Sequence, residues 1–256
     1  MYQLKSYIRF LLNSTNQHGV HSPFIYYFIT KCLYDKASYS AYNKLKAYRN
    51  TLISSNDSLD ITDLGEGSKV LGSKTRKVNK MVKVSSSSMK EARLLFKVVQ
   101  YFNCKSILEL GTSLGMGTYA MALANEFSNV TSIEGCANTS DYTKHNFKKL
   151  KINHITFLKG DFATTISTLK QSSFDCIYFD GHHNKDATIK YFEALLPKAN
   201  NNAVFIFDDI YWSKGMTEAW QYIKAHEAVT VTVDIFQLGF VFFRKEQARE
   251  HFKIRV

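Results

Sequence analysis

The chain has 256 residues, of which 45% are hydrophobic and 21% are charged. This is the composition of a globular protein with a substantial core, which argues against a generally disordered chain. The net charge of +11 is uneven, because residues 1–90 hold 14 basic and 5 acidic side chains (+9) and residues 91–256 hold 19 and 17 (+2). Such a basic region could attract nucleic acid, anionic lipid or an acidic small substrate, or could simply face solvent.

The cysteines are spaced too widely for a metal or disulfide framework. Cys32, Cys104, Cys136 and Cys176 form no CxxC pair, which is typical of reduced core thiols. No apolar segment approaches the roughly 18 residues needed to span a bilayer. The first 13 residues lack the apolar core and cleavage site of a signal peptide. We therefore expect a cytoplasmic protein without a transmembrane segment.

Residues 1–90 are expected to form a helical, basic N-terminal cap. In "SPFIYYFITKCLY", Ser22 is placed to be an N-cap and Pro23 the first helical residue. A second helix is expected in "SAYNKLKAYRNTLISS". Residues 56–90 are polar and rich in glycine and serine, which predicts a loop or lid before the helix "MKEARLLFKVVQYF". The main domain is then predicted to occupy residues 91–256.

From Lys105 onward, apolar runs of strand length alternate with helical segments. Strands that are apolar on both faces and separated by helices indicate a parallel sheet covered on both sides. The last two runs, "AVTVTVDIF" and "LGFVFFRK", are too close for a parallel crossover, so they predict an antiparallel hairpin at one sheet edge. The expected fold is α/β and Rossmann-like: a doubly wound, seven-stranded, mostly parallel sheet with a C-terminal antiparallel hairpin.

Two glycine-rich stretches compete for the role of nucleotide loop. "ILELGTSLGMGTYAMALA" has a strand before it and a helix after it, and its Gly111, Gly115 and Gly117 permit close backbone approach. The rival "DITDLGEGSKVLGSKTRK" has only a short apolar lead-in and is followed by basic polar residues. The first stretch is therefore predicted to bind the ligand, and the rival is left as a basic lid.

Acidic residues follow the predicted strands. Glu134 ends "VTSIE", where a carboxylate can accept hydrogen bonds from ribose hydroxyls, a feature that a dinucleotide dehydrogenase would share. Asp161, Asp180, Asp208 and Asp209 lie at the C-terminal ends of later strands, the edge at which doubly wound sheets bind ligands. Close carboxylates repel one another, and a divalent cation such as Mg²⁺ would relieve that repulsion.

At these residues the chain resembles the class I S-adenosylmethionine-dependent methyltransferases, and among them the metal-dependent O-methyltransferases of the catechol and caffeoyl-CoA type. The resemblance runs from about Ser85 to Arg244 and rests on "ELGTSLGMGT", Glu134, "DGHH" and "DDIYW" in that order. It implies seven cofactor-binding residues: Glu109, Gly111, Ser113, Gly117, Glu134, Asp161 and Asp180. It implies a metal, Mg²⁺ or another divalent cation, on Asp180, Asp208 and Asp209, although the family usually has Asn at the third position.

The mechanism implied by the resemblance is an in-line transfer of a methyl group to a substrate hydroxyl, with a base taking the proton. Lys185 is favoured narrowly over His183 as that base, and Trp212 is placed to stack on the acceptor. The expected acceptor is a small hydroxylated molecule.

Several alternatives stay open at this point. One is an RNA methyltransferase that binds phosphates through the basic "GSKTRKVNK", and another is a non-catalytic S-adenosylmethionine-binding protein. A dinucleotide oxidoreductase is disfavoured because the sequence offers no second half of a dinucleotide fold. The oligomeric state, a homodimer included, is not determined by the sequence.

Overall fold

The computed structural model describes residues 1–62, 74–84 and 86–256. The chain divides into two compact units. Residues 36–168 form the first, which contains the predicted nucleotide loop and is called the glycine-loop unit. Residues 1–35 and 169–256 form the second, called the hairpin unit. The predicted division at residue 90, into a cap and a catalytic domain, is a functional division and stays a prediction.

The glycine-loop unit is built around three parallel strands. These are β3 (Ser106–Leu110), β4 (Asn129–Glu134) and β5 (Ile155–Lys159). Its helices are α3 (Ser40–Ser54), α4 (Val78–Val84), α5 (Met89–Tyr101), α6 (Met116–Ala124), α7 (Ala137–Lys149) and α8 (Phe162–Ser167). Ser88 and Glu91 form a capping box that explains why α5 begins where predicted.

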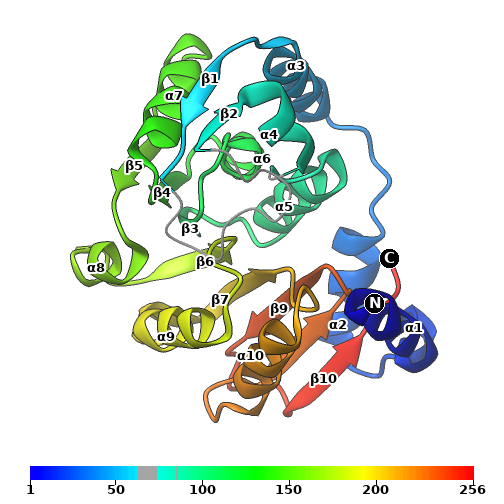
Figure 1. The fold of residues 1–256 in the computed structure, drawn as a ribbon. Helices are drawn as coiled ribbons and strands as arrows, with labels where there is room; N and C mark the ends of the chain where they lie inside the picture. The colour runs from blue at the N-terminus through cyan, green and yellow to red at the C-terminus, as the bar shows by residue number, and fades with distance from the viewer. Residues whose placement is uncertain (63–73, 85) are drawn as a thin grey trace. The chain divides into compact units, whose positions relative to one another are not determined.

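The segment expected to be a loop contains regular structure. β1 (Ser58–Asp60) pairs antiparallel with β2 (Thr75–Lys77), and α4 follows directly. Figure 1 shows β1 beside α7, with which it is in contact. The core of the rival glycine stretch, residues 63–73, lies outside the described residues. The two strands were not predicted because they bury little of their surface, so their residues show no apolar pattern.

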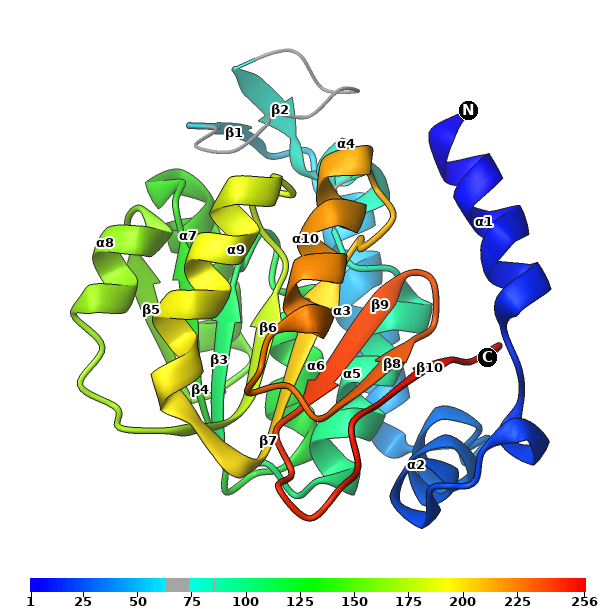
Figure 2. The ribbon, with the colours of Figure 1, turned by 90° about the horizontal axis from the view of Figure 1, so that it is seen from below.

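The hairpin unit contains five strands within its described residues: β6 (Phe174–Phe179), β7 (Ala199–Asp208), β8 (Val231–Asp234), β9 (Leu238–Phe242) and β10 (Glu250–Lys253). Its helical segments are α1 (Tyr2–Asn13), η1 (Gln17–Gly19), α2 (Pro23–Phe28), η2 (Ile29–Leu33), α9 (Lys185–Leu195), η3 (Leu196–Lys198) and α10 (Lys214–Ala225). Figure 2 shows α9 and α10 side by side, in agreement with their contacts. As predicted, Ser22 caps α2 by accepting from the amide of Ile25.

The two faces of β9 pack against different helices. The ring of Phe28 in α2 lies 5.3 Å from Phe240 and 5.5 Å from Phe242, measured between centroids. The intervening Gly239 faces α10, where an added Cβ would lie 2.7 Å from the Trp220 ring. Side chains that alternate along a strand therefore anchor both α2 and α10 to this unit.

The predicted fold class is confirmed: the protein is α/β, with a mostly parallel sheet, antiparallel C-terminal strands and N-terminal helices. β8 and β9 form the predicted hairpin. The hairpin is not the edge, however, because β10 pairs in parallel with β8. The strand "EHFK" was missed because Phe252 is its only buried residue. None of the helices in the described ranges has the length and apolar character that a membrane span requires.

Candidate functional site

The glycine loop joins β3 to α6 through left-handed backbone. Gly111 has φ of 105°, Ser113 of 46° and Gly115 of 76°. An added Cβ at Gly115 would lie 2.6 Å from the Thr143 side chain and 2.8 Å from the Phe147 ring. A larger residue at this position would meet both a strained dihedral angle and a clash. The loop therefore brings the backbone at the start of α6 into a conformation that only glycine adopts cheaply.

Side chains from other elements of the same unit hold this loop. The Tyr48 hydroxyl of α3 donates to the carbonyl oxygen of Leu114 (2.7 Å), and the Thr143 hydroxyl of α7 donates to that of Ser113 (2.8 Å). Tyr48 is buried, and burial raises the pKa of its phenol, so the hydroxyl stays protonated as a donor. Neither contact was predicted, since only the tertiary structure brings α3 and α7 to the loop.

Glu134 is half-buried at the end of β4 and binds the loop with both carboxylate oxygens. Its Oε2 accepts from the backbone amide of Ser113 (2.8 Å), and its Oε1 accepts from the amide of Cys136 (2.9 Å). An ionised carboxylate has about four acceptor positions, so these two bonds leave capacity for further donors. The geometry is compatible with the predicted role toward ribose hydroxyls, which stays a prediction.

Glu109 lies beneath the loop, with 1% of its surface exposed. The hydroxyls of Thr118 and Ser132 both donate to its Oε2, at 2.5 Å each. An added Cβ at Gly117 would lie 2.9 Å from its Oε1. This carboxylate therefore supports the start of α6 from below. Ser132 was missed, although a serine within an apolar strand is a signal of a buried hydrogen bond.

Asp161 is exposed after β5, and its Oδ1 accepts from the amide of Thr164 as the N-cap of α8. A capping aspartate has a structural reason to be present. Its place beside an adenine base stays a prediction.

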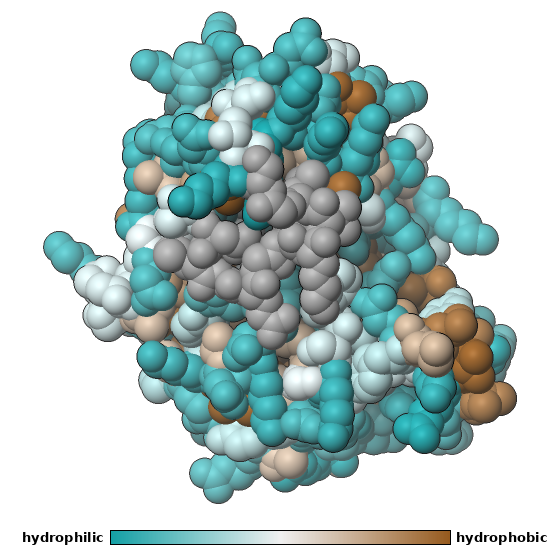
Figure 3. All heavy atoms as spheres, in the orientation of Figure 1, coloured by the Kyte–Doolittle hydropathy of each residue, from teal (hydrophilic) through white to brown (hydrophobic). Residues whose placement is uncertain are grey.

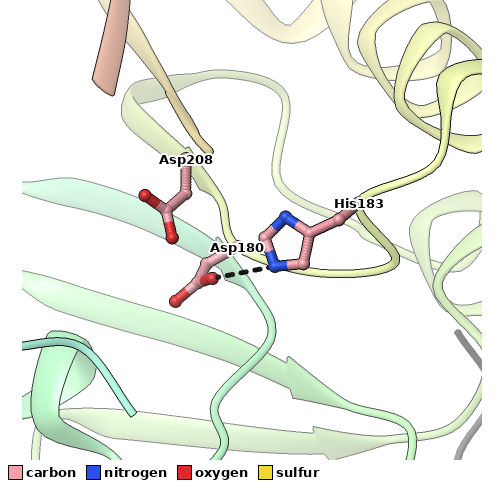
Figure 4. Close-up of side chains that lie close together, drawn as sticks. All are labelled: Asp180, His183 and Asp208. Carbon is pink, nitrogen blue, oxygen red and sulfur yellow. Dashed lines mark ion pairs between the residues drawn. The ribbon is translucent and has the colours of Figure 1, made fainter. Parts of the chain in front are cut away.

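In the hairpin unit, two predicted carboxylates meet an imidazole. Asp180 follows β6 and Asp208 ends the neighbouring parallel strand β7, where Phe179 pairs with Phe207. Potential ligand atoms of Asp180, His183 and Asp208 lie within 4.8 Å of one another, and all three residues are half-buried. His183 Nε2 is 3.6 Å from Asp180 Oδ1, and Figure 4 shows the imidazole and both carboxylates close together.

The third member of this group differs from the predicted one. Asp209 has a left-handed backbone, with φ of 53°, and is not part of the group of ligand atoms found among the described residues. The imidazole of His183 occupies that place. The two carboxylates offer the oxygen ligands that divalent ions such as Mg²⁺ and Mn²⁺ accept, so Asp180 and Asp208 fit a cation with the imidazole beside them.

The turn after β6 explains how His183 reaches the carboxylates. His182 and His183 have φ of 64° and 37°, two consecutive left-handed residues without a glycine. Backbone of this kind costs on the order of 1–3 kcal/mol per residue and persists only when the surroundings impose it. His182 Nδ1 is hydrogen-bonded to the Tyr191 hydroxyl of α9 at 2.6 Å. One histidine therefore ties the turn to α9 while the other faces Asp180.

Lys185 is the first residue of α9, and its side chain contacts α10. Its Nζ donates to Glu218 of α10 at 2.7 Å, and this hydrogen bond and the charge of Glu218 raise the pKa of the lysine. A raised pKa keeps the amine protonated, which is unfavourable for a base at neutral pH. The lysine that the sequence favoured thus belongs to a surface ion pair in the structure.

Trp212 is 38% exposed, and its ring centroid lies 6.4 Å from that of His183. The neighbouring Tyr211 is buried instead, and its hydroxyl donates to Asp234 of β8. Burial raises the pKa of both groups of this pair. The Tyr211–Asp234 contact fixes the turn after β7, so that an exposed aromatic ring stands beside the Asp180, His183 and Asp208 group.

Comparisons with known proteins concern the domain and the fold. Residues 108–210 match a family model described as a methyltransferase domain. The fold is similar to an S-adenosylhomocysteine-bound methyltransferase of Podospora anserina (13% identity, TM-score 0.61, covering 88% of this chain and 97% of that one). It is also similar to an O-methyltransferase of Bacillus cereus in complex with S-adenosylhomocysteine (18% identity, TM-score 0.54, 84% and 95% covered).

A third similar structure is the O-methyltransferase TomG of Streptomyces achromogenes in complex with S-adenosylmethionine (13% identity, TM-score 0.56, 81% and 91% covered). At these identities the likeness concerns the fold. No relative among the curated proteins matches the sequence.

Proposed function

We propose that the chain is a class I S-adenosylmethionine-dependent methyltransferase, as its domain match and its fold indicate, and that it methylates a hydroxyl oxygen of a small acceptor with the help of a divalent cation. The observation that carries the proposal is the group formed by Asp180, His183 and Asp208. In a methyltransferase that worked without a cation, two carboxylates side by side at adjacent strand ends would only repel each other.

In this proposal the glycine-loop unit binds the donor. Gly111, Ser113 and Gly117 line the loop, and Glu134 accepts from the ribose hydroxyls while its oxygens hold Ser113 and Cys136. Glu109 supports the methionine end from beneath the loop, and Asp161 lies beside the adenine. Asp180, a residue of the hairpin unit, is the remaining donor-binding residue that the resemblance implies.

Asp180 and Asp208 would hold the cation, with Asp209 as the neighbouring carboxylate that the resemblance implies. When bound there, a divalent cation would hold the acceptor hydroxyl and lower its pKa. The negative charge of the two aspartates is then balanced rather than repulsive. Trp212, half-exposed beside His183, would offer an aromatic face to the acceptor.

We assign the proton transfer to His183 in preference to Lys185. His183 lies against Asp180, whereas Lys185 donates to Glu218, which raises the pKa of the lysine. A neutral imidazole can accept the acceptor proton near neutral pH, and an ion-paired ammonium group cannot. The hydroxyl oxygen then attacks the methyl carbon, and the sulfonium leaves as a neutral thioether.

The two other readings of the sequence predict different outcomes. RNA methylation would use the basic stretch 72–80, of which residues 72 and 73 lie outside the described part of the chain. It would require an RNA affinity that falls steeply with salt. A non-catalytic binding protein would bind the donor without turning it over.

The test combines calorimetry with a methyl-transfer assay on the purified full chain. We expect S-adenosylhomocysteine to bind, and a panel of catechols and other small hydroxylated compounds to be methylated only when Mg²⁺ or Mn²⁺ is supplied. Full activity in EDTA would refute the requirement for a divalent cation but not the methyl transfer itself. Donor binding with no transfer to any hydroxyl compound, and transfer to RNA instead, would overturn the choice of acceptor.

A further inference from the structure

The outer face of α1 is apolar and uncovered. Leu4, Ile8, Leu11 and Leu12 recur at the spacing of one helical stripe, and their exposed fractions are 63%, 50%, 39% and 80%. Figure 3 shows hydrophobic atoms gathered over this helix. Isolated exposed leucines are ordinary, but four on one stripe of a short helix form a patch of the kind that binds something.

The opposite face of α1 already attaches the helix to the hairpin unit. Ser6 and Phe10 are buried, and the rings of Tyr7 and Phe10 lie 4.8 and 5.6 Å from that of Phe236, between β8 and β9. The packing of α1 therefore uses one face only. The stripe of Leu4, Ile8, Leu11 and Leu12 stays exposed beside that attachment.

Basic side chains border the stripe. Lys5 and Arg9 are exposed and four residues apart, so they lie on one side of the helix beside the apolar face. Residues 1–34 contain Lys5, Arg9 and Lys31 and no aspartate or glutamate, the first acidic residue being Asp35. An apolar stripe next to uncompensated positive charge complements a surface that is both apolar and anionic.

A second copy of the chain is a poorer occupant. In a two-fold contact the same surface meets itself, so Lys5 and Arg9 would face their own counterparts with no acidic residue of α1 or α2 to pair them. A 12-residue helix is also only about 18 Å long, whereas stable interfaces involve roughly 20–30 residues on each side.

We propose that α1 binds the surface of an anionic lipid membrane. Leu4, Ile8, Leu11 and Leu12 enter the boundary between headgroups and acyl chains, and Lys5 and Arg9 contact the lipid phosphates. The helix lies in the plane of the surface, since it is too short to cross it. Two exposed tyrosines of α2, Tyr26 and Tyr27, add side chains of the type found at membrane interfaces.

The experiment is co-sedimentation of the full chain with vesicles of phosphatidylcholine alone or with about 30% phosphatidylglycerol. We expect binding to the anionic vesicles only, weakened as salt rises from about 50 to 500 mM. Lys5→Gln with Arg9→Gln should lower the affinity about 30-fold, since each basic residue contributes about a fivefold factor. Ile8→Ser with Leu12→Ser should lower it at least about tenfold.

The control is Phe127→Ser, which removes a side chain that is 78% exposed in the glycine-loop unit and should leave vesicle binding unchanged. Unchanged binding of S-adenosylhomocysteine would show that each variant is folded, and no readout depends on the acceptor chemistry. Equal binding to neutral vesicles, or none to anionic ones, would overturn the proposal. So would a dimer in sedimentation velocity that Ile8→Ser with Leu12→Ser converts to a monomer.

Discussion

Two pairs of carboxylates lie at or near the C-terminal ends of neighbouring parallel strands in this protein, and they are held in different ways. In the glycine-loop unit, Glu109 and Glu134 accept hydrogen bonds from hydroxyls and backbone amides of their own unit. In the hairpin unit, Asp180 and Asp208 lie beside each other and beside His183, all half-buried. The two glutamates stabilise the conformation of the glycine loop. The two aspartates place two negative charges close together.

Carboxylates at similar positions along their strands therefore serve different chemistry. A carboxylate surrounded by donors is stabilised in its charged form by the protein itself. Two carboxylates close together raise each other's pKa unless a positive charge is present. The glutamates are therefore expected to matter for folding and donor binding, and the aspartates for a cation and for turnover. The following variants test this contrast, in order of decreasing effect.

Asp208→Asn should lower the methyl-transfer rate on the order of 1,000-fold, because it removes one of the charges proposed to hold the cation. Affinity for S-adenosylhomocysteine, measured by calorimetry, should change less than about threefold. Asp186→Asn, an exposed carboxylate at the start of α9, is the matched control and should retain activity. A loss of donor affinity equal to the loss of rate would contradict the separation of the two pairs.

His183→Gln should reduce the rate about 100-fold, the ordinary contribution of a general base. A methyl-transfer assay measures the rate, and His145→Gln, which removes an exposed histidine of α7, should leave it unchanged. If His183→Gln instead weakens Mn²⁺ binding as much as Asp208→Asn does, the imidazole is a ligand of the cation rather than the base.

Glu109→Gln should lower the free energy of unfolding by about 2 kcal/mol, because a buried carboxylate with two hydroxyl donors is replaced by an amide. Denaturant titration measures the change, and Glu126→Gln serves as the exposed control in the same unit. A stability equal to that of the wild type would contradict a role of Glu109 in folding and would indicate a functional role, as proposed for the aspartates.

His251 of β10, at the edge of the hairpin unit, is expected to have the smallest effect, on the pH dependence of stability. Partial desolvation, together with the nearby charges of Lys224 and Arg249, lowers the pKa of His251, which is hydrogen-bonded to Thr232 of β8. The folded protein therefore binds this proton less well than the unfolded chain. Stability should therefore fall as pH falls through about 6.5, the unfolded pKa. His251→Gln should reduce that loss between pH 7 and 5 in thermal unfolding, whereas substitution of the exposed His21 should not.

Much of the fold and half of the candidate site followed from local pattern. The alternation of apolar strands with helices predicted the α/β class, and the single residue Gln237 between "AVTVTVDIF" and "LGFVFFRK" predicted the hairpin that β8 and β9 form. The strand before "GTSLGMG" located the glycine loop, and the ends of β6 and β7 located Asp180 and Asp208. These features depend on periodicity and on strand ends, which neighbouring residues determine.

The remaining decisions needed the tertiary structure. The sequence predicted Asp209 as the third group beside Asp180 and Asp208, whereas the structure places His183 there. The left-handed backbone at His182 and His183, together with the Tyr191 contact, turns the imidazole toward the two carboxylates. The sequence also could not show that α3 and α7 hold the loop, that β10 joins β8, or that the apolar face of α1 is uncovered. Each of these depends on contacts between residues far apart in the chain, for which local pattern carries no signal.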